Sequence, residues 1–277
     1  MEPLSARDLL NVWEAGRNQP TLQQALLLLA AASPELPKER LAHLPIGRRD
    51  ALLLRLRQWS FGNQLSSVVA CPICHQRLEF TLDSRELTGT TQSADSNLAL
   101  LDTYPASDPN IYTINLDGYL VAFRLPDSTD LAALSQRVAE DAAGDLASEQ
   151  NFLLARCLVS ALATGSHEQA IPVPLVALPA AVVAAIQEQM EVVDPQANLQ
   201  IALTCPACLH EWSARLDIVT FFWGELDDWA RRTLQQVHQL AMAYGWRETE
   251  TLALSAWRRQ LYLQLINGAE QQQWAHI

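Results

Sequence analysis

Two stretches of the sequence share one layout: SVVACPICHQRLEFTLD at residues 67–83 and IALTCPACLHEWSARLD at residues 201–217. In each, a short run of β-prone residues leads into Cys-Pro-x-Cys, and a second strand-like run follows and ends at Leu-Asp. Equivalent positions in the two stretches are 134 residues apart. The pattern predicts one β-hairpin unit used twice, with a pair of cysteines at each turn.

The cysteine pairs have the spacing of metal ligands. A Cys-x-x-Cys turn presents two thiolates to one ion, and two such turns supply the four tetrahedral ligands that zinc prefers. We therefore expect one shared Zn²⁺, with these ligands: Cys71, Cys74, Cys205 and Cys208. Four thiolates leave no coordination position open, so the expected zinc is structural and clamps two distant segments together.

Other interpretations of the cysteine pairs remain open. One or both pairs could be metal-free thiols or a local disulfide, although a reducing compartment disfavours the disulfide. A thioredoxin-like redox pair requires a cysteine at a helix N-terminus after a strand, whereas each pair here leads into a strand. His75 and His210 lie beside the pairs, and either could replace one sulfur ligand or simply lie at the surface.

Hydrophobic periodicity predicts that the rest of the chain is mainly helical. We expect the α+β class, mainly helical, with a split zinc-ribbon and β-hairpin part formed by the two Cys-Pro-x-Cys knuckles. The expected organisation is an N-terminal helical region at 1–62, a first zinc knuckle with a long loop and a β-hairpin at 63–126, a helical insertion at 127–195, a second zinc knuckle at 196–217, and C-terminal helices with a tail at 218–277.

Local signals place the first elements. Ser5 and Thr21 are expected to be the N-caps of two helices. Residues 84–110 are polar without a clear period, which predicts a long loop. Asp117 and Gly118 supply the positive-φ positions of a type I′ turn, so a β-hairpin is expected over residues 111–125.

The second half reads as a series of helices. One is expected from about residue 147 to residue 162, and another begins at Pro179, where a missing N–H is harmless. A long amphipathic helix containing Phe222 is expected to end at Gly245. Residues 268–277 read as a frayed tail.

Composition and charge exclude some classes of function. The 277 residues are 49% apolar and 18% charged, which is typical of a folded chain, and the formal net charge is −12. This negative charge opposes binding to nucleic acid and to anionic membranes. It therefore also argues against a zinc-ribbon module that binds nucleic acid. The N-terminus lacks a signal-peptide pattern and no uninterrupted apolar run reaches a span's length, so a cytoplasmic location is expected, free or on a particle.

No catalytic pattern is visible in the sequence. Gly-x-Ser-x-Gly, a Walker loop, Gly-x-Gly-x-x-Gly and His-Glu-x-x-His do not occur. Cys157 lies on the apolar face of LLARCLVSAL, where a cysteine usually packs as a small hydrophobic residue. The chain is therefore expected not to be an enzyme.

Arginines and tryptophans gather in two regions. The first is a basic cluster, expected to be mainly a solvated helix face: Arg48, Arg49, Arg55 and Arg57. The second is a group of tryptophans in the C-terminal helices: Trp223, Trp229, Trp246 and Trp257. Core packing is the first interpretation of these tryptophans, and a partner-binding helical surface is the second.

Several blocks of the sequence resemble the hub-assembly chaperone family of T-even-type phage baseplates, in the form found in phage-tail-like contractile injection clusters of bacteria. The matching blocks are LPIGRRDALLLRLRQWSFG (44–62), CPICHQRLEF (71–80), FRLP (123–126), ALTCPACLHEW (202–212), LDIVTFFWGELDDWARR (216–232), VHQLAMAYGW (237–246) and LALSAWRRQLYLQL (252–265). AYGW followed by LALSAWRR is more specific than the knuckles, which many zinc ribbons share.

The resemblance implies a non-enzymatic assembly chaperone or adaptor for the baseplate hub of a contractile tail or injection system. Its implied partners are baseplate hub, spike or tape-measure proteins, with no nucleic acid and no membrane. Alternatives are a minor structural component retained in the baseplate, or a general zinc-ribbon protein-interaction module. The family tends to place Gly after the second cysteine of each knuckle, where this chain has His75 and Leu209. A left-handed backbone there costs a branched side chain about 1 kcal/mol or more, so weaker metal binding or a different turn is expected.

Overall fold

The computed structural model describes residues 1–88, 111–140, 145–164 and 170–274. Within these residues the protein is mostly helical with small antiparallel sheets, so the predicted α+β class is confirmed. Most of the long loop predicted over residues 84–110 lies outside the described residues, and its first residues form the short helix α5 (Ser84–Thr88).

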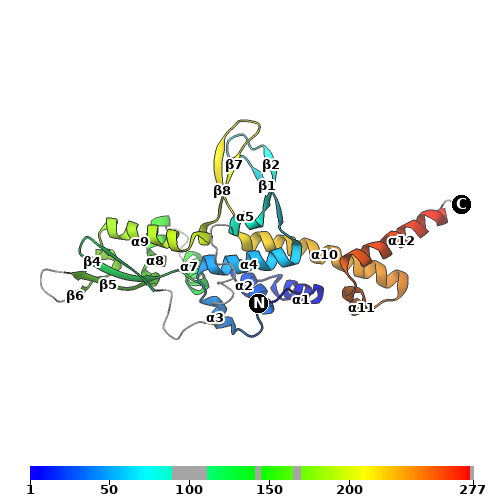
Figure 1. Ribbon diagram of the computed structural model, residues 1–277, viewed down its shortest axis with the longest axis horizontal. Helices are drawn as coiled ribbons and strands as arrows, with labels where there is room; N and C mark the ends of the chain where they lie inside the picture. The colour runs from blue at the N-terminus through cyan, green and yellow to red at the C-terminus, as the bar shows by residue number, and fades with distance from the viewer. Residues whose placement is uncertain (89–110, 141–144, 165–169, 275–277) are drawn as a thin grey trace.

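A helical body forms the centre of the molecule (Figure 1). It consists of α1 (Ala6–Gly16), α2 (Thr21–Ala32), α3 (Lys38–Ala42), α4 (Ile46–Phe61) and the first turns of α10 (Ile218–Tyr244). Their apolar faces meet in one core that includes the fully buried Leu28, Leu53 and Phe222. Ser5 caps α1 as predicted, through a reciprocal capping box with Asp8. The prediction for Thr21 was wrong by one position, because Pro20 occupies the N-cap of α2 and Thr21 is its first residue.

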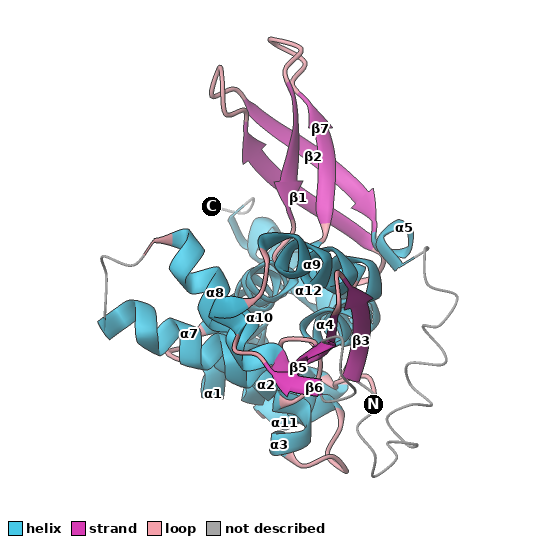
Figure 2. Ribbon diagram, turned by 90° about the vertical axis from the view of Figure 1, so that its left-hand side faces the viewer, coloured by secondary structure: helices cyan, strands magenta, loops and turns pink. Residues whose placement is uncertain are grey.

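Two hairpins project from this body as an arm (Figures 1 and 2). The first joins β1 (Gln64–Ala70) to β2 (Arg77–Asp83), and the second joins β7 (Gln200–Thr204) to β8 (Glu211–Arg215). Both hairpins are antiparallel, and their strands lie side by side in both views. The predicted hairpin unit used twice is confirmed, and "the arm" below means these four strands with their two turns.

A second sheet lies at one end of the molecule (Figure 1). Its order is β3-β4-β5-β6, with every pair antiparallel. The strands are β3 (Ile111–Leu116), β4 (Tyr119–Arg124), β5 (Leu158–Thr164) and β6 (Ala170–Pro172). Helices α8 (Leu146–Cys157) and α9 (Ala180–Val193) pack on this sheet in a separate apolar core containing Phe123 and Ile186. The β3–β4 hairpin confirms the predicted turn, with φ of 52° at Asp117 and 77° at Gly118.

The helix predicted from about residue 147 to residue 162 was wrong at its C-terminal end. Helix α8 ends at Cys157, and residues 158–164 form β5, which pairs with β4. Alone, LVSALAT is compatible with either state, and the open edge of β4 selects the strand because propensity yields to tertiary pairing. The expected helical insertion at 127–195 therefore contains two strands besides α7 (Ser128–Glu140), α8 and α9.

The C-terminal helices extend the molecule at the other end. Helix α10 runs for 27 residues and ends, as predicted, at Gly245, whose φ of 70° is left-handed. Helices α11 (Glu248–Ala253) and α12 (Ala256–Trp274) follow. The prediction of a frayed tail from residue 268 was wrong for residues 268–274, because α12 continues to Trp274. Residues 275–277 lie outside the described residues. Trp223 packs over Gly16, as predicted for core tryptophans, whereas Trp257 is 71% exposed.

Candidate metal centre

The two knuckles have the same backbone hydrogen bonds. In the first, the Cys71 N–H donates to the Gln76 carbonyl at 2.9 Å, and the His75 N–H donates to the Cys71 carbonyl at 3.0 Å. The second repeats both bonds at the equivalent positions, each at 2.8 Å. These bonds fold each turn back so that both thiols face the neighbouring knuckle.

The four cysteine sulfurs meet between the knuckles. The Sγ atoms of Cys71 and Cys208 are 3.7 Å apart, and those of Cys74 and Cys205 are 3.5 Å apart. All four Sγ atoms lie within 4.8 Å of one another. Zn–S bonds of about 2.3 Å in a tetrahedron place sulfurs about 3.8 Å apart, so the arrangement fits one tetrahedral ion. All five cysteines of the chain are free thiols, which does not support the disulfide alternative.

The electrostatics of the site differ between its buried and exposed thiols. Cys71 and Cys205 are buried, whereas Cys74 and Cys208 are exposed. Burial opposes ionisation of Cys71, but backbone N–H groups of Cys74 and Ile73 outweigh it and lower the pKa to about 7. For Cys208, the backbone hydrogen bond from His210 lowers the pKa, but partial desolvation of the sulfur and its contacts with the three neighbouring thiols raise it to about 12. Four adjacent thiols cannot all ionise in the absence of a cation, because the thiolates repel one another. A coordinated cation compensates this negative charge and deprotonates its thiol ligands.

Left-handed backbone follows each cysteine pair. His75 and Leu209 both have a φ of 59°, the conformation that glycine adopts without strain. Leu and His therefore adopt a backbone conformation that favours glycine, and the two turns make the same backbone hydrogen bonds. The expectation of a different turn is wrong, and the expectation of weaker metal binding stays a prediction.

Glycine at these two positions should stabilise the protein. Relief of left-handed strain outweighs the backbone entropy that glycine adds, so His75→Gly and Leu209→Gly should each raise the free energy of unfolding by about 0.5–1 kcal/mol. Urea denaturation measures the change. Gln76→Gly is the matched control, because Gln76 lies in the same turn with an ordinary negative φ and should lose stability. A loss in all three variants would contradict the strain argument.

The histidines do not join the cluster. The potential ligand atoms that meet there, among the described residues, belong to the four cysteines. The His210 ring stacks on Trp212 with their centroids 6.0 Å apart and an interplanar angle of 7°. The alternative of a histidine ligand is therefore not supported.

Cys157 lies far from this centre in the fold. It is 1% exposed at the end of α8, and burial, followed by the charge of Asp130, raises its pKa to about 12. A thiol held so firmly in its neutral form is a poor nucleophile. The prediction of a core cysteine is confirmed.

A buried arginine anchors the base of the arm. Arg57 is 1% exposed, and its Nε and Nη2 donate to the Glu225 carboxylate at 2.7 and 2.6 Å. Its Nη1 and Nη2 also donate to the carbonyls of Gly62 and Gln64, where β1 begins, at 2.6 and 2.7 Å. The prediction of a solvated basic face was wrong for Arg57 and for Arg49, which is 5% exposed. The anionic partner of Arg57 lies on α10, far along the chain, and no local pattern signals it.

The comparison with known families covers most of the chain. A family model described as "T4 bacteriophage base plate protein" matches residues 5–223, which include both knuckles and the start of α10. The chain belongs to this baseplate family. Membership implies association with phage tail or baseplate proteins. No curated protein and no solved structure gave a significant match.

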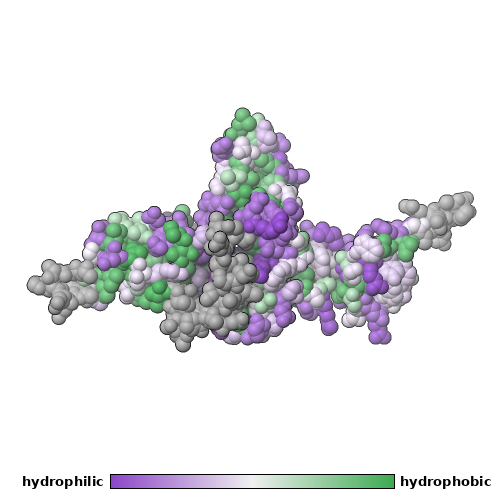
Figure 3. All heavy atoms as spheres, in the orientation of Figure 1, coloured by the Kyte–Doolittle hydropathy of each residue, from purple (hydrophilic) through white to green (hydrophobic). Residues whose placement is uncertain are grey.

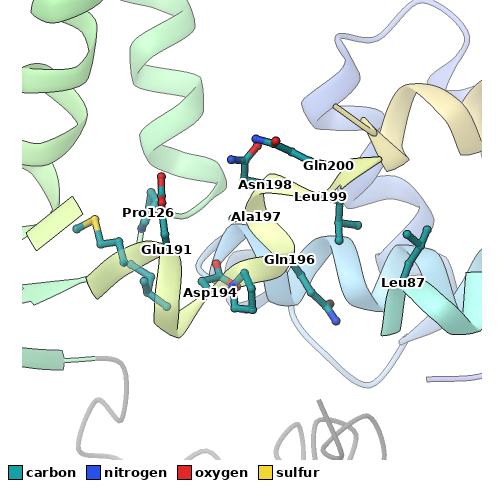
Figure 4. A pocket seen from close by; sticks show the side chains of 12 residues that line it. Leu87, Pro126, Glu191, Asp194, Gln196, Ala197, Asn198, Leu199 and Gln200 are labelled. Carbon is teal, nitrogen blue, oxygen red and sulfur yellow. The ribbon is translucent and has the colours of Figure 1, made fainter. Parts of the chain in front are cut away.

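A pocket of this baseplate protein lies at the base of the arm (Figure 4). Its volume is about 520 Å³, and its lining includes Leu87 of α5, Pro126, Glu191 of α9, and Asp194. The Asp194 carboxylate accepts a hydrogen bond from the Gly47 N–H at 2.9 Å, and burial raises its pKa. The described lining contains no Ser, Thr, Cys, His, Lys or Tyr, so it offers no nucleophile with an adjacent base. In the described part of the baseplate protein, no helix is long and apolar enough to cross a membrane.

Proposed function

We propose that this protein is a non-enzymatic assembly chaperone or adaptor for the baseplate hub of a phage-like contractile tail or injection system. We further propose that Cys71, Cys74, Cys205 and Cys208 hold one structural Zn²⁺. The observation that carries the proposal is the cluster of four sulfurs that joins two hairpins from distant segments into one arm. Family membership supports a place in baseplate assembly.

The choice of zinc follows from the ligands and their surroundings. A tetrahedral set of four thiolates is typical of zinc or iron–sulfur sites, and four sulfurs within 4.8 Å leave room for a single ion. The metal has a clear structural task, because isolated two-stranded hairpins are marginally stable. Strands β2 and β8 alternate between exposed and half-buried residues along the arm, so they contribute little core of their own.

The end of the arm offers a docking surface for a hub partner. Ile73 and Leu209, which we call the tip, are 64% and 76% exposed. Figure 3 shows hydrophobic residues at the top of the arm, above a more polar base. Leu209 combines a left-handed backbone with an exposed apolar side chain, and neither feature stabilises the isolated fold. Contact with an apolar surface of a hub, spike or tape-measure protein would bury this exposed side chain.

Charged residues at the tip should weaken partner capture. The double variant Ile73→Asp with Leu209→Asp should weaken binding to a co-expressed hub protein by tenfold or more, because it buries two unpaired carboxylates in the contact. Affinity capture with the neighbouring tail proteins measures this, and metal content should stay at about one zinc per chain. Val176→Asp is the control, because Val176 is 92% exposed but lies outside the arm. Equal capture by the double variant and the wild type would contradict docking through the tip.

The second candidate function is a minor component retained in the finished baseplate. An exposed stripe on α12 favours it, because Trp257, Leu261 and Leu265 recur at helical spacing and are 71%, 38% and 63% exposed. A lasting component needs such a further contact surface, and α12 lies beyond the residues that the family model matches. Mass spectrometry of purified particles separates the two functions: an assembly chaperone is absent from them, whereas a retained component is present in fixed proportion.

A further inference from the structure

Strand β3 forms one edge of the four-stranded sheet. Among the described strands it pairs with β4 alone, and β6 forms the opposite edge. The β6 edge is only three residues long and contains Pro172, and both features discourage pairing with another strand. Strand β3, with the sequence IYTINL, has six residues and contains neither a charged residue nor proline.

The turn determines which backbone groups of β3 face outward. Leu116 and Tyr119 flank the two-residue turn, so they form a hydrogen-bonded pair of the β3–β4 ladder. Hydrogen-bonded and non-hydrogen-bonded pairs then alternate along an antiparallel ladder. The N–H and C=O groups of Thr113 and Asn115 therefore point away from β4, in position to pair with a further strand.

We propose that β3 pairs antiparallel with β3 of a second copy of this chain about a two-fold axis. The pairing joins two four-stranded sheets into one continuous sheet. With Thr113 of one copy opposite Thr113 of the other, Tyr112 lies opposite Ile114 on both sides of the axis. Threonine pairs and aromatic with β-branched pairs are favourable across strands.

The side chains of β3 favour a second copy as the occupant. The chain carries a net charge of −12, but this strand is uncharged, so self-pairing places no like charges opposite each other. Tyr112 and Ile114 already pack against the core beneath the sheet. Pairing with the same strand continues that apolar layer across the axis, and it brings Ile111, which is 44% exposed, opposite Asn115 of the second copy.

The test uses the full chain and a proline at the outward-facing position. Thr113→Pro removes an outward N–H while leaving the β3–β4 hydrogen bonds in place. Light scattering over a range of concentrations should show a wild-type dimer that dissociates on dilution. The dimer dissociation constant of the Thr113→Pro variant should be at least tenfold higher. Thr113→Val keeps the N–H and should remain a dimer. Circular dichroism checks that each variant is folded.

Hydrogen exchange of the wild type tests the same pairing without a variant. The amides of Thr113 and Asn115 should exchange slowly at high protein concentration and rapidly on dilution, whereas the Ile114 amide should stay protected. A wild type that is monomeric at every concentration would overturn the proposal. So would a dimer in which these two amides exchange rapidly. Protection that arises only when another tail protein is added would show that the edge takes a strand of that protein instead.

Discussion

Serine at Cys71 or Cys205 should release the proposed zinc and unfold the arm. Each substitution removes a buried thiolate from a site whose ligands come from two distant segments, so the binding energy of the metal is also folding energy. We expect zinc to fall from about one per chain to near zero, and the free energy of unfolding to fall by more than about 4 kcal/mol. Metal analysis of protein purified without added zinc, together with urea denaturation, measures both changes.

Cys157→Ser is the matched control for these variants. It also replaces a buried cysteine, but one in the core around α8, so zinc should stay bound. Loss of zinc in this variant would show that the ligands have been assigned wrongly. Unchanged stability in both Cys71→Ser and Cys205→Ser would contradict a shared site. Removal of the proposed zinc from the wild type with a chelator should lower the free energy of unfolding as the serine substitutions do, because binding of a metal by four cysteines contributes folding energy.

The knuckles could be predicted from the sequence because their chemistry is local. Cys71 and Cys74 are presented by one turn, and the need for four ligands then pairs them with the second turn, whatever lies between. The β3–β4 hairpin was predictable for the same reason, since Asp117 and Gly118 alone define its turn. Family membership agrees with the resemblance at the level of the baseplate.

Features that depend on distant partners could not be predicted in this way. Strand β5 forms because β4 offers it an edge, and its own residues do not distinguish helix from strand. The burial of Arg57 depends on Glu225 in another helix, so its neighbours in the sequence suggested a solvated face. Exposure of Ile73 and Leu209 likewise depends on how far the arm projects from the body.

Loss of the Arg57 side chain should destabilise the protein more than loss of any exposed arginine. Arg57→Met leaves the Glu225 carboxylate and the carbonyls of Gly62 and Gln64 without their donor, so we expect a loss of about 3–5 kcal/mol in urea denaturation. Arg231→Met is the control, because Arg231 pairs with Asp227 on the surface of α10 and should cost less than about 1 kcal/mol.

The same variant separates the base of the arm from its metal centre. The cysteines lie at the opposite end of the hairpins from Gly62 and Gln64, so folded Arg57→Met protein should still bind about one zinc. Its capture of a hub partner should nevertheless weaken, since the tip is held in place through β1 and the Arg57 anchor. Full capture together with full zinc binding would show that the tip works without a fixed base. Loss of zinc would show instead that the two ends of the arm fold as one unit.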